Sequence, residues 1–216
     1  MKQRLLACVG VFGLLTLCGT ARAADPPAPR AGFQLALRTG YSLPLGKVWK
    51  GFPMSDLTTG QVPLLLDIGG KPIPELFLGA YIGFAFGKAA GVTKDVCEVG
   101  GGCATGSFRL GIEGHWHFLP GGWLDPWAGY GIGIESLAVG KSKDGTMDSY
   151  AVAGFEFAHF MLGADWRPER TVGLGPFVDV SLGKYRSVTT NSETDDIPNT
   201  ALHSWITLGV RGVLFP

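Results

Sequence analysis

The feature that most limits what this chain can fold into is a side-chain pattern with a period of two. In the run from Ser107 to Leu119, SFRLGIEGHWHFL, apolar side chains occupy the even positions and charged or histidine side chains occupy odd ones, with Gly114 as the one gap in the apolar series. Successive side chains of a β-strand point to opposite faces, so this run predicts a strand with one apolar and one polar face. It is long enough to cross a bilayer at a tilt, which takes about 9–11 strand residues.

Eight segments share this alternation and predict eight strands. Their ranges are Phe33 to Leu45, Val62 to Gly69, Leu78 to Gly87, Ser107 to Leu119, Pro126 to about Val139, Tyr150 to Trp166, Gly175 to Leu182 and Leu202 to Leu214. The alternation changes phase within the sixth segment, which predicts a β-bulge near His159. After Ala24 no apolar run is long enough for a transmembrane helix, so a membrane location would require a closed barrel.

The predicted connections alternate in length. Those near 69–75, 119–125 and 167–173 are short and contain Pro or Gly, whereas those near 47–61, 88–106, 140–149 and 187–200 are long and polar. Short turns at one end and long loops at the other are typical of outer-membrane barrels, with the short turns and both termini in the periplasm. The sequence therefore predicts an all-β fold, an eight-stranded, antiparallel, up-and-down transmembrane β-barrel over residues 32–216.

The first 23 residues have the layout of a secretory signal peptide. Lys2 and Arg4 precede an apolar run that ends at Leu17, and the small-residue sequence Ala21-Arg22-Ala23 follows. Cys18 raises the alternative of lipid attachment, although Leu17 is larger than the residue such sites favour. Residues 24–31 form a short Pro-rich leader. Removing the signal peptide takes three basic residues from 18 and no acidic ones, leaving a net charge near −3, which gives no electrostatic reason to expect a nucleic-acid partner.

A soluble barrel with its apolar face turned inward would show the same alternation. The polar face here is mostly Gly, Ala and Ser, with lysines near strand ends, and small residues suit the crowded interior of a narrow barrel. Five aromatic side chains lie toward the short-turn ends and predict an interfacial girdle: Trp116, Trp123, Trp127, Tyr130 and Trp166. The composition therefore favours an apolar face toward lipid, with a lipocalin-like cavity as the alternative.

The chain resembles the small outer-membrane β-barrel family, the group around the OmpA membrane domain, OmpX and OmpW. The resemblance covers Gly32 to Phe215 and includes the runs LGADWRP, from Leu162, and GPFVD, from Gly175. It implies the outer membrane of a Gram-negative bacterium as the location, with outer-membrane lipid and the barrel-insertion machinery as partners. Members usually end on an aromatic residue that this machinery reads, whereas here Pro216 follows Phe215.

The inward faces are expected to carry a polar network in the lumen. Its predicted members are Arg38, Asp67, Arg109, Glu113, His115, His117, Glu135, Glu156, Asp179 and Arg211, with Asp165 on the same face. An eight-stranded barrel is only wide enough for side chains to fill it, so these charges must pair across the lumen or hold water. We expect a polar plug, with a gated ion path as the alternative.

Two patterns raise the question of chemistry. Glu113, His115 and His117 share one strand face and offer metal ligands, but no further ligand is identifiable, so we expect hydrogen-bonded lumen histidines and no metal or other cofactor. His203 and Ser204 suggest a hydrolase, since some barrels modify lipid A. Adjacent strand residues face opposite ways, however, so this pair lacks the geometry for proton transfer.

Cys97 and Cys103 are the two cysteines beyond the signal peptide, and they lie in the longest predicted loop. An oxidising compartment favours a disulfide between them. The acidic loop from Ser187 to Thr200 offers a surface for Ca²⁺ or a partner, or is simply solvated.

The sequence as a whole predicts a non-enzymatic outer-membrane barrel with a structural or surface-interaction role, acting on an extracellular partner through its long loops. A narrow transport barrel for small solutes or ions is the second hypothesis, and a lipid-modifying enzyme is the third.

Overall fold

The computed structural model describes residues 31–91, 93, 103–143, 146–169, 171–190 and 193–214. The predicted signal peptide and nearly all of the leader lie outside these residues, as does Cys97. Within the described part of the chain, no helix is both long and apolar enough to cross a membrane.

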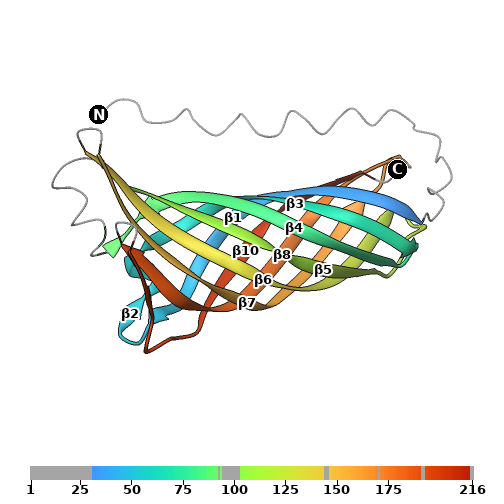
Figure 1. Cartoon of the computed structure of the whole chain (residues 1–216). Coiled ribbons are helices and arrows are strands. Elements are labelled where there is room, and N and C mark those ends of the chain that lie inside the picture. The colour runs from blue at the N-terminus through green and yellow to red at the C-terminus, as the bar shows by residue number, and fades with distance from the viewer. Residues whose placement is uncertain are drawn as a thin grey trace, which may run out of the picture.

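Eight long strands form a closed antiparallel ring (Figure 1). They are β1 (Gly32–Trp49), β3 (Thr58–Ile73), β4 (Leu76–Ala89), β5 (Cys103–His117), β6 (Leu124–Lys143), β7 (Thr146–Trp166), β8 (Val172–Thr190) and β10 (His203–Leu214). Each strand pairs with the next in sequence, and β10 pairs with both β8 and β1, from Leu35 opposite Leu214 to Gly46 opposite His203. This closure confirms the predicted eight-stranded, up-and-down barrel, and it leaves no exposed sheet edge along the paired segments.

The two ends of the barrel differ. At one end, where β1 begins and β10 ends in Figure 1, short turns join β3 to β4, β5 to β6 and β7 to β8. The opposite end carries β2 (Phe52–Pro53), a 3₁₀ turn, η1 (Met54–Asp56), and β9 (Glu193–Asp196), which pairs with β8. Two predicted loops contain paired strands. In 140–149, β6 and β7 remain paired from Gly140 opposite Ser149 to Lys143 opposite Thr146, and in 187–200, β8 pairs with β9 from Ser187 opposite Asp196 to Thr190 opposite Glu193.

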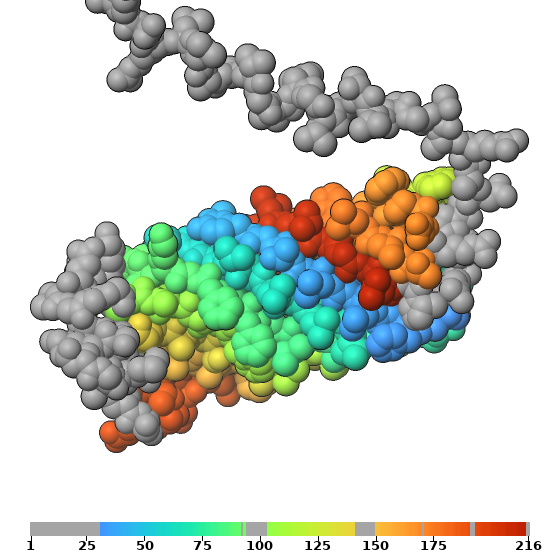
Figure 2. Space-filling view, turned by 90° about the horizontal axis from the view of Figure 1, so that it is seen from above, coloured from blue at the N-terminus to red at the C-terminus, as the bar shows by residue number. Residues whose placement is uncertain are grey.

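Side-chain exposure follows the predicted alternation. On β1, Leu37, Tyr41 and Leu43 are about half exposed, whereas Arg38 and Ser42 are buried inside the barrel. Neighbouring strands build a continuous outer wall, seen in Figure 2 along the side formed by the N-terminal strands and β10. The prediction of an aromatic girdle is wrong for Trp127, which is buried in the lumen because it occupies an inward position of β6. Trp116, Tyr130 and Trp166 face outward.

The bulge predicted near His159 is confirmed. Between β6 and β7 the register advances from Gly131 opposite His159 to Gly133 opposite Glu156, so three steps on β7 face two steps on β6. The extra residue brings Glu156 and His159, which are three residues apart, to the same inward face. An uninterrupted strand would place them on opposite faces.

Candidate functional site

The lumen is the candidate site, because the structure buries all ten sequence-predicted network residues within the barrel. Each is no more than 8% exposed. They are Arg38, Asp67, Arg109, Glu113, His115, His117, Glu135, Glu156, Asp179 and Arg211. Because their strands are far apart in sequence, the ring of strands rather than any local motif brings them together.

Arg38 on β1 is the centre of this network. It donates hydrogen bonds to Asp67 Oδ1 from Nε (3.1 Å) and Nη2 (2.7 Å), and Nη2 also reaches Glu113 Oε2 (2.9 Å). Asp179 lies 3.7 Å from Nη1, which also contacts Met161 Sδ at 2.9 Å. One guanidinium therefore holds carboxylates from three other strands, which fits the several donors of an arginine fork.

His159 continues the network toward the end of the barrel that carries β2, η1 and β9, which we term the outer end. Its Nε2 lies 2.8 Å from Asp179 Oδ2 and its Nδ1 lies 3.0 Å from Glu156 Oε1. An imidazole that faces a carboxylate at both nitrogens satisfies both contacts only when each nitrogen carries a proton. The Tyr81 hydroxyl donates a hydrogen bond to the same Glu156 oxygen (2.8 Å), so this oxygen lies close to both the imidazole and the phenol.

Arg109 links this part of the lumen to its outer layer. Its guanidinium lies 3.6 Å from Glu156 and 3.6 Å from Glu135, and it stands over the ring of Trp205 at 5.5 Å. Glu135 also accepts a hydrogen bond from His203, whose ring stacks on Tyr185 with centroids 4.0 Å apart. In this layer of the lumen, charged side chains therefore pack against the aromatic rings of Trp205 and Tyr185.

The short-turn end has its own pairs. Arg211 pairs with Asp165, lies 4.0 Å from Asp67 and stands over the Trp127 ring at 4.6 Å. His117 Nδ1 donates to Asp125 Oδ2 at 2.9 Å. Charged contacts therefore run from Asp165 through Arg211 and Asp67 to Arg38. From there they continue through Asp179, His159, Glu156 and Arg109 to Glu135.

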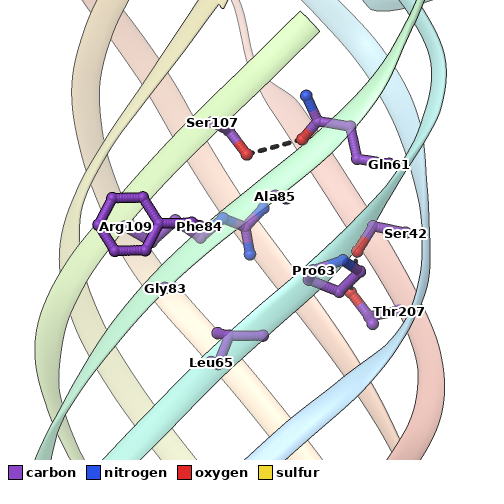
Figure 3. A pocket seen from close by; sticks show the side chains of 10 residues that line it. All are labelled: Ser42, Gln61, Pro63, Leu65, Gly83, Phe84, Ala85, Ser107, Arg109 and Thr207. Atoms are coloured by element: carbon purple, nitrogen blue, oxygen red, sulfur yellow. Dashed lines mark hydrogen bonds between the residues drawn. The ribbon is translucent and has the colours of Figure 1, made fainter.

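A small hollow lies among the described residues of the lumen. A hollow of about 10 Å³ lies beside Arg109 (Figure 3), close to the space that one water molecule needs. Its polar rim is held by the Ser107 hydroxyl, which donates to Gln61 Oε1 (2.6 Å), and by the Ser42 and Thr207 hydroxyls, 2.8 Å apart. This hollow accommodates a single water molecule.

A hydrophobic cluster, which we term the outer cap, lies beyond the polar layers. Its buried members are Val48, Met54, Leu57, Leu137, Val139, Val152, Tyr185, Ile197 and Trp205. Trp49 and Phe52 stack at its edge with centroids 4.7 Å apart. The segment between β1 and β3 supplies Met54 and Leu57, so this predicted loop folds back over the barrel mouth.

The structure separates the histidines of the possible metal site. His115 Nε2 lies 3.3 Å from Glu113 and its ring stacks on Trp127, whereas His117 pairs with Asp125. No group of three metal-ligating side chains occurs among the residues described. His203 is buried inside, and the neighbouring Ser204 occupies an outward position on β10, so the two do not form a catalytic pair.

Sequence reasoning missed several lumen members. His159 was recognised only as the position of the bulge, although it bridges Glu156 and Asp179. Tyr81 lies on the predicted inward face but was not assigned to the network, and Trp127 was assigned to the girdle, although both are buried in the lumen. The available signal was the strand phase, which assigns a face to every residue once the bulge is placed.

No family model matches the sequence, and no curated protein matches it. Solved structures do match the fold. Neisserial surface protein A (NspA) superposes with a TM-score of 0.50 at 10% identity, covering 85% of this chain and 97% of that one. The outer membrane protein OprG from Pseudomonas aeruginosa gives a TM-score of 0.50 at 11% identity, with 88% and 99% covered. The outer membrane protease OmpT from Escherichia coli also matches, at a TM-score of 0.39 and 10% identity, with 91% and 100% covered. The chain therefore has the fold of a small outer-membrane β-barrel.

Proposed function

We propose that this protein is a non-enzymatic barrel of the bacterial outer membrane, with a closed lumen and a structural or surface-interaction role outside the membrane. The observation that carries the proposal is the filled interior. The ion-pair series occupies the lumen from Asp165 to Glu135, and the outer cap covers the mouth above it. A barrel of eight strands leaves no open channel once its side chains are packed.

Ion passage through this lumen would have to separate buried pairs. Arg38 alone holds three carboxylates within 3.7 Å. Leaving one partner of a buried pair without its counter-ion costs about 3–5 kcal/mol. The network is therefore better suited to fixing strand register than to conduction.

The part of the barrel beyond the membrane supports a role in surface interaction. β6 has 20 residues and β7 has 21, whereas a membrane crossing takes about 9–11. The excess lies at the end that carries the outer cap, which gives this region a core of its own. It presents an ordered surface to an extracellular partner, while outer-membrane lipid and the insertion machinery are the partners of the barrel wall.

Planar-bilayer conductance tests this proposal. The purified mature chain is expected to give no steady single-channel steps under conditions in which a porin conducts. Steady steps from the wild type that disappear in Arg109→Ala would overturn it in favour of transport, because Arg109 bridges Glu135 and Glu156 in the narrow outer lumen. The mass of lipid A from cells that express the protein is expected to stay unchanged, and a changed mass would favour an enzyme.

A further inference from the structure

A groove of about 300 Å³ lies on the outer face of the barrel across β5 to β8. Small residues form its floor and larger apolar ones its walls. The outward-facing lining consists of Phe108, Ile134, Ser136, Ala153, Phe155, Arg186 and Ser187. The register shows why a hollow forms here, since Ser136 stands opposite Ala153 and Ala153 opposite Ser187, so that three small side chains adjoin on one face.

A second bulge turns a charged side chain toward this groove. Between β7 and β8 the register passes from Ala153 opposite Ser187 to Gly154 opposite Tyr185, which leaves Arg186 as the extra residue. Tyr185 and Val188 both pack against the outer cap, so the two residues between them both face outward. The bulge depends on Gly154, because a Cβ there would collide with the Lys184 carbonyl oxygen.

The groove lies at the edge of the apolar band. The outward residues of β8 are apolar from Val172 to Leu182, a strand length of about 34 Å at about 3.4 Å per residue. At a tilt of about 40° this length spans about 26 Å, which matches the apolar band of about 25 Å in such barrels. Lys184 is the next outward residue, and it is exposed. Lys184 and Arg186 therefore lie at the level of lipid headgroups.

The two cations have no counter-ion among the residues described, since no carboxylate there lies within ion-pair distance of either. Glu135 borders the groove, but its carboxylate is inside the barrel with His203 and Arg109. Asp196 stands opposite Ser187 on the other side of β8, away from the groove floor on β6 and β7. The groove therefore combines a floor of small side chains and apolar walls with a rim of two cations that no described carboxylate neutralises.

We propose that this groove binds a phosphate-bearing lipid of the outer leaflet, with one acyl chain between Phe108 and Phe155 and the phosphate against Lys184 and Arg186. This inference depends on the proposed function, which places the barrel in the outer membrane with its outer cap outside the cell. The small residues of the floor leave space for the chain, and the cations complement the headgroup charge.

Native mass spectrometry of the detergent-solubilised mature chain tests the site, with diphosphoryl lipid A and its phosphate-free form as probes. The wild type is expected to bind one diphosphoryl lipid with a preference on the order of tenfold. The double variant Lys184→Gln/Arg186→Gln should lose that preference. Lys88→Gln is the matched control, because Lys88 is an exposed lysine near the end of β4, outside the groove. Ala153→Leu adds bulk at an exposed floor position and should weaken the binding of both lipids.

Three results would overturn the site: equal binding of both lipids to the wild type, an equal loss in Lys88→Gln, or full displacement of the lipid by inorganic phosphate. The gel mobility of boiled and unboiled samples separates this failure from failure of the proposed function. A chain that shows a heat-dependent shift but no lipid preference would refute the lipid site alone. A chain that shows no shift and is soluble without detergent would refute the membrane barrel as well.

Discussion

Replacing Arg38 tests whether the lumen network stabilises the barrel. Arg38→Met keeps an unbranched stem and removes the charged guanidinium. The substitution leaves Asp67 and Glu113 without the guanidinium that lies 2.7 and 2.9 Å from them. Asp179 retains His159 at 2.8 Å, so the main loss falls on the other two carboxylates. Asp67 loses both of its hydrogen bonds and keeps only Arg211 at 4.0 Å, while Glu113 loses its hydrogen bond and keeps His115 at 3.3 Å.

The expected cost is about 4 kcal/mol, from the range of about 3–5 kcal/mol for breaking a buried pair. Urea unfolding of the protein in lipid vesicles, followed by tryptophan fluorescence, measures it. With an m-value of about 2 kcal/mol per molar urea, the midpoint should fall by about 2 M. Arg186→Met is the control, since Arg186 faces outward, and it should change stability by less than about 0.5 kcal/mol.

A compensated variant separates loss of charge pairing from loss of packing. Arg38→Met combined with Asp67→Asn and Glu113→Gln removes the stranded charges and should recover at least about 2 kcal/mol. A fall of less than about 1 kcal/mol in Arg38→Met, or a triple variant no more stable than the single one, would refute the argument that this cluster of charges holds the strands together.

Three further predictions concern the cap, the wall and the loop. Leu137→Ala removes a buried side chain of the outer cap and should cost about 2–5 kcal/mol, with faster proteolysis of the outer end in the folded protein; an unchanged cleavage rate would contradict a packed cap. Gly163→Val should abolish the heat-dependent gel shift, because the added Cβ would overlap the buried indole ring of Trp127. Gly212→Ala is the control and should keep the shift, since a Cβ there meets nothing within 4 Å. Equal gel shifts in the two variants would contradict the close packing at Gly163. Cys97 and Cys103 should react with a thiol reagent in the folded protein only after reduction, as mass measurement would show, and labelling without reduction would rule out their disulfide.

The fold could be predicted because apolar and polar side chains alternate along each strand. The alternation sorts Leu37 from Arg38, and Phe155 from Glu156, onto opposite faces, and the small residues of the polar face assign that face to the interior. The phase change near His159 was visible for the same reason, because one extra residue reverses every later assignment on that strand. The extent of pairing was not visible: polar residues 140–149 suggested a loop, yet the paired strands continue through them.

For the candidate site, the alternation predicted which residues face inward but not which of them make contact. The sequence alone assigned Arg38, Asp67, Glu113 and Asp179 to the inward face, since alternation is a local property of each strand. Only the closed barrel decided that one guanidinium would hold all three carboxylates, because strand tilt and stagger set the height of every side chain along the lumen. The same closure placed Arg186 over a hollow in the wall and covered the mouth with the outer cap. These contacts join strands that are far apart in the sequence, and the sequence separation of two strands does not predict the distance between them in the barrel.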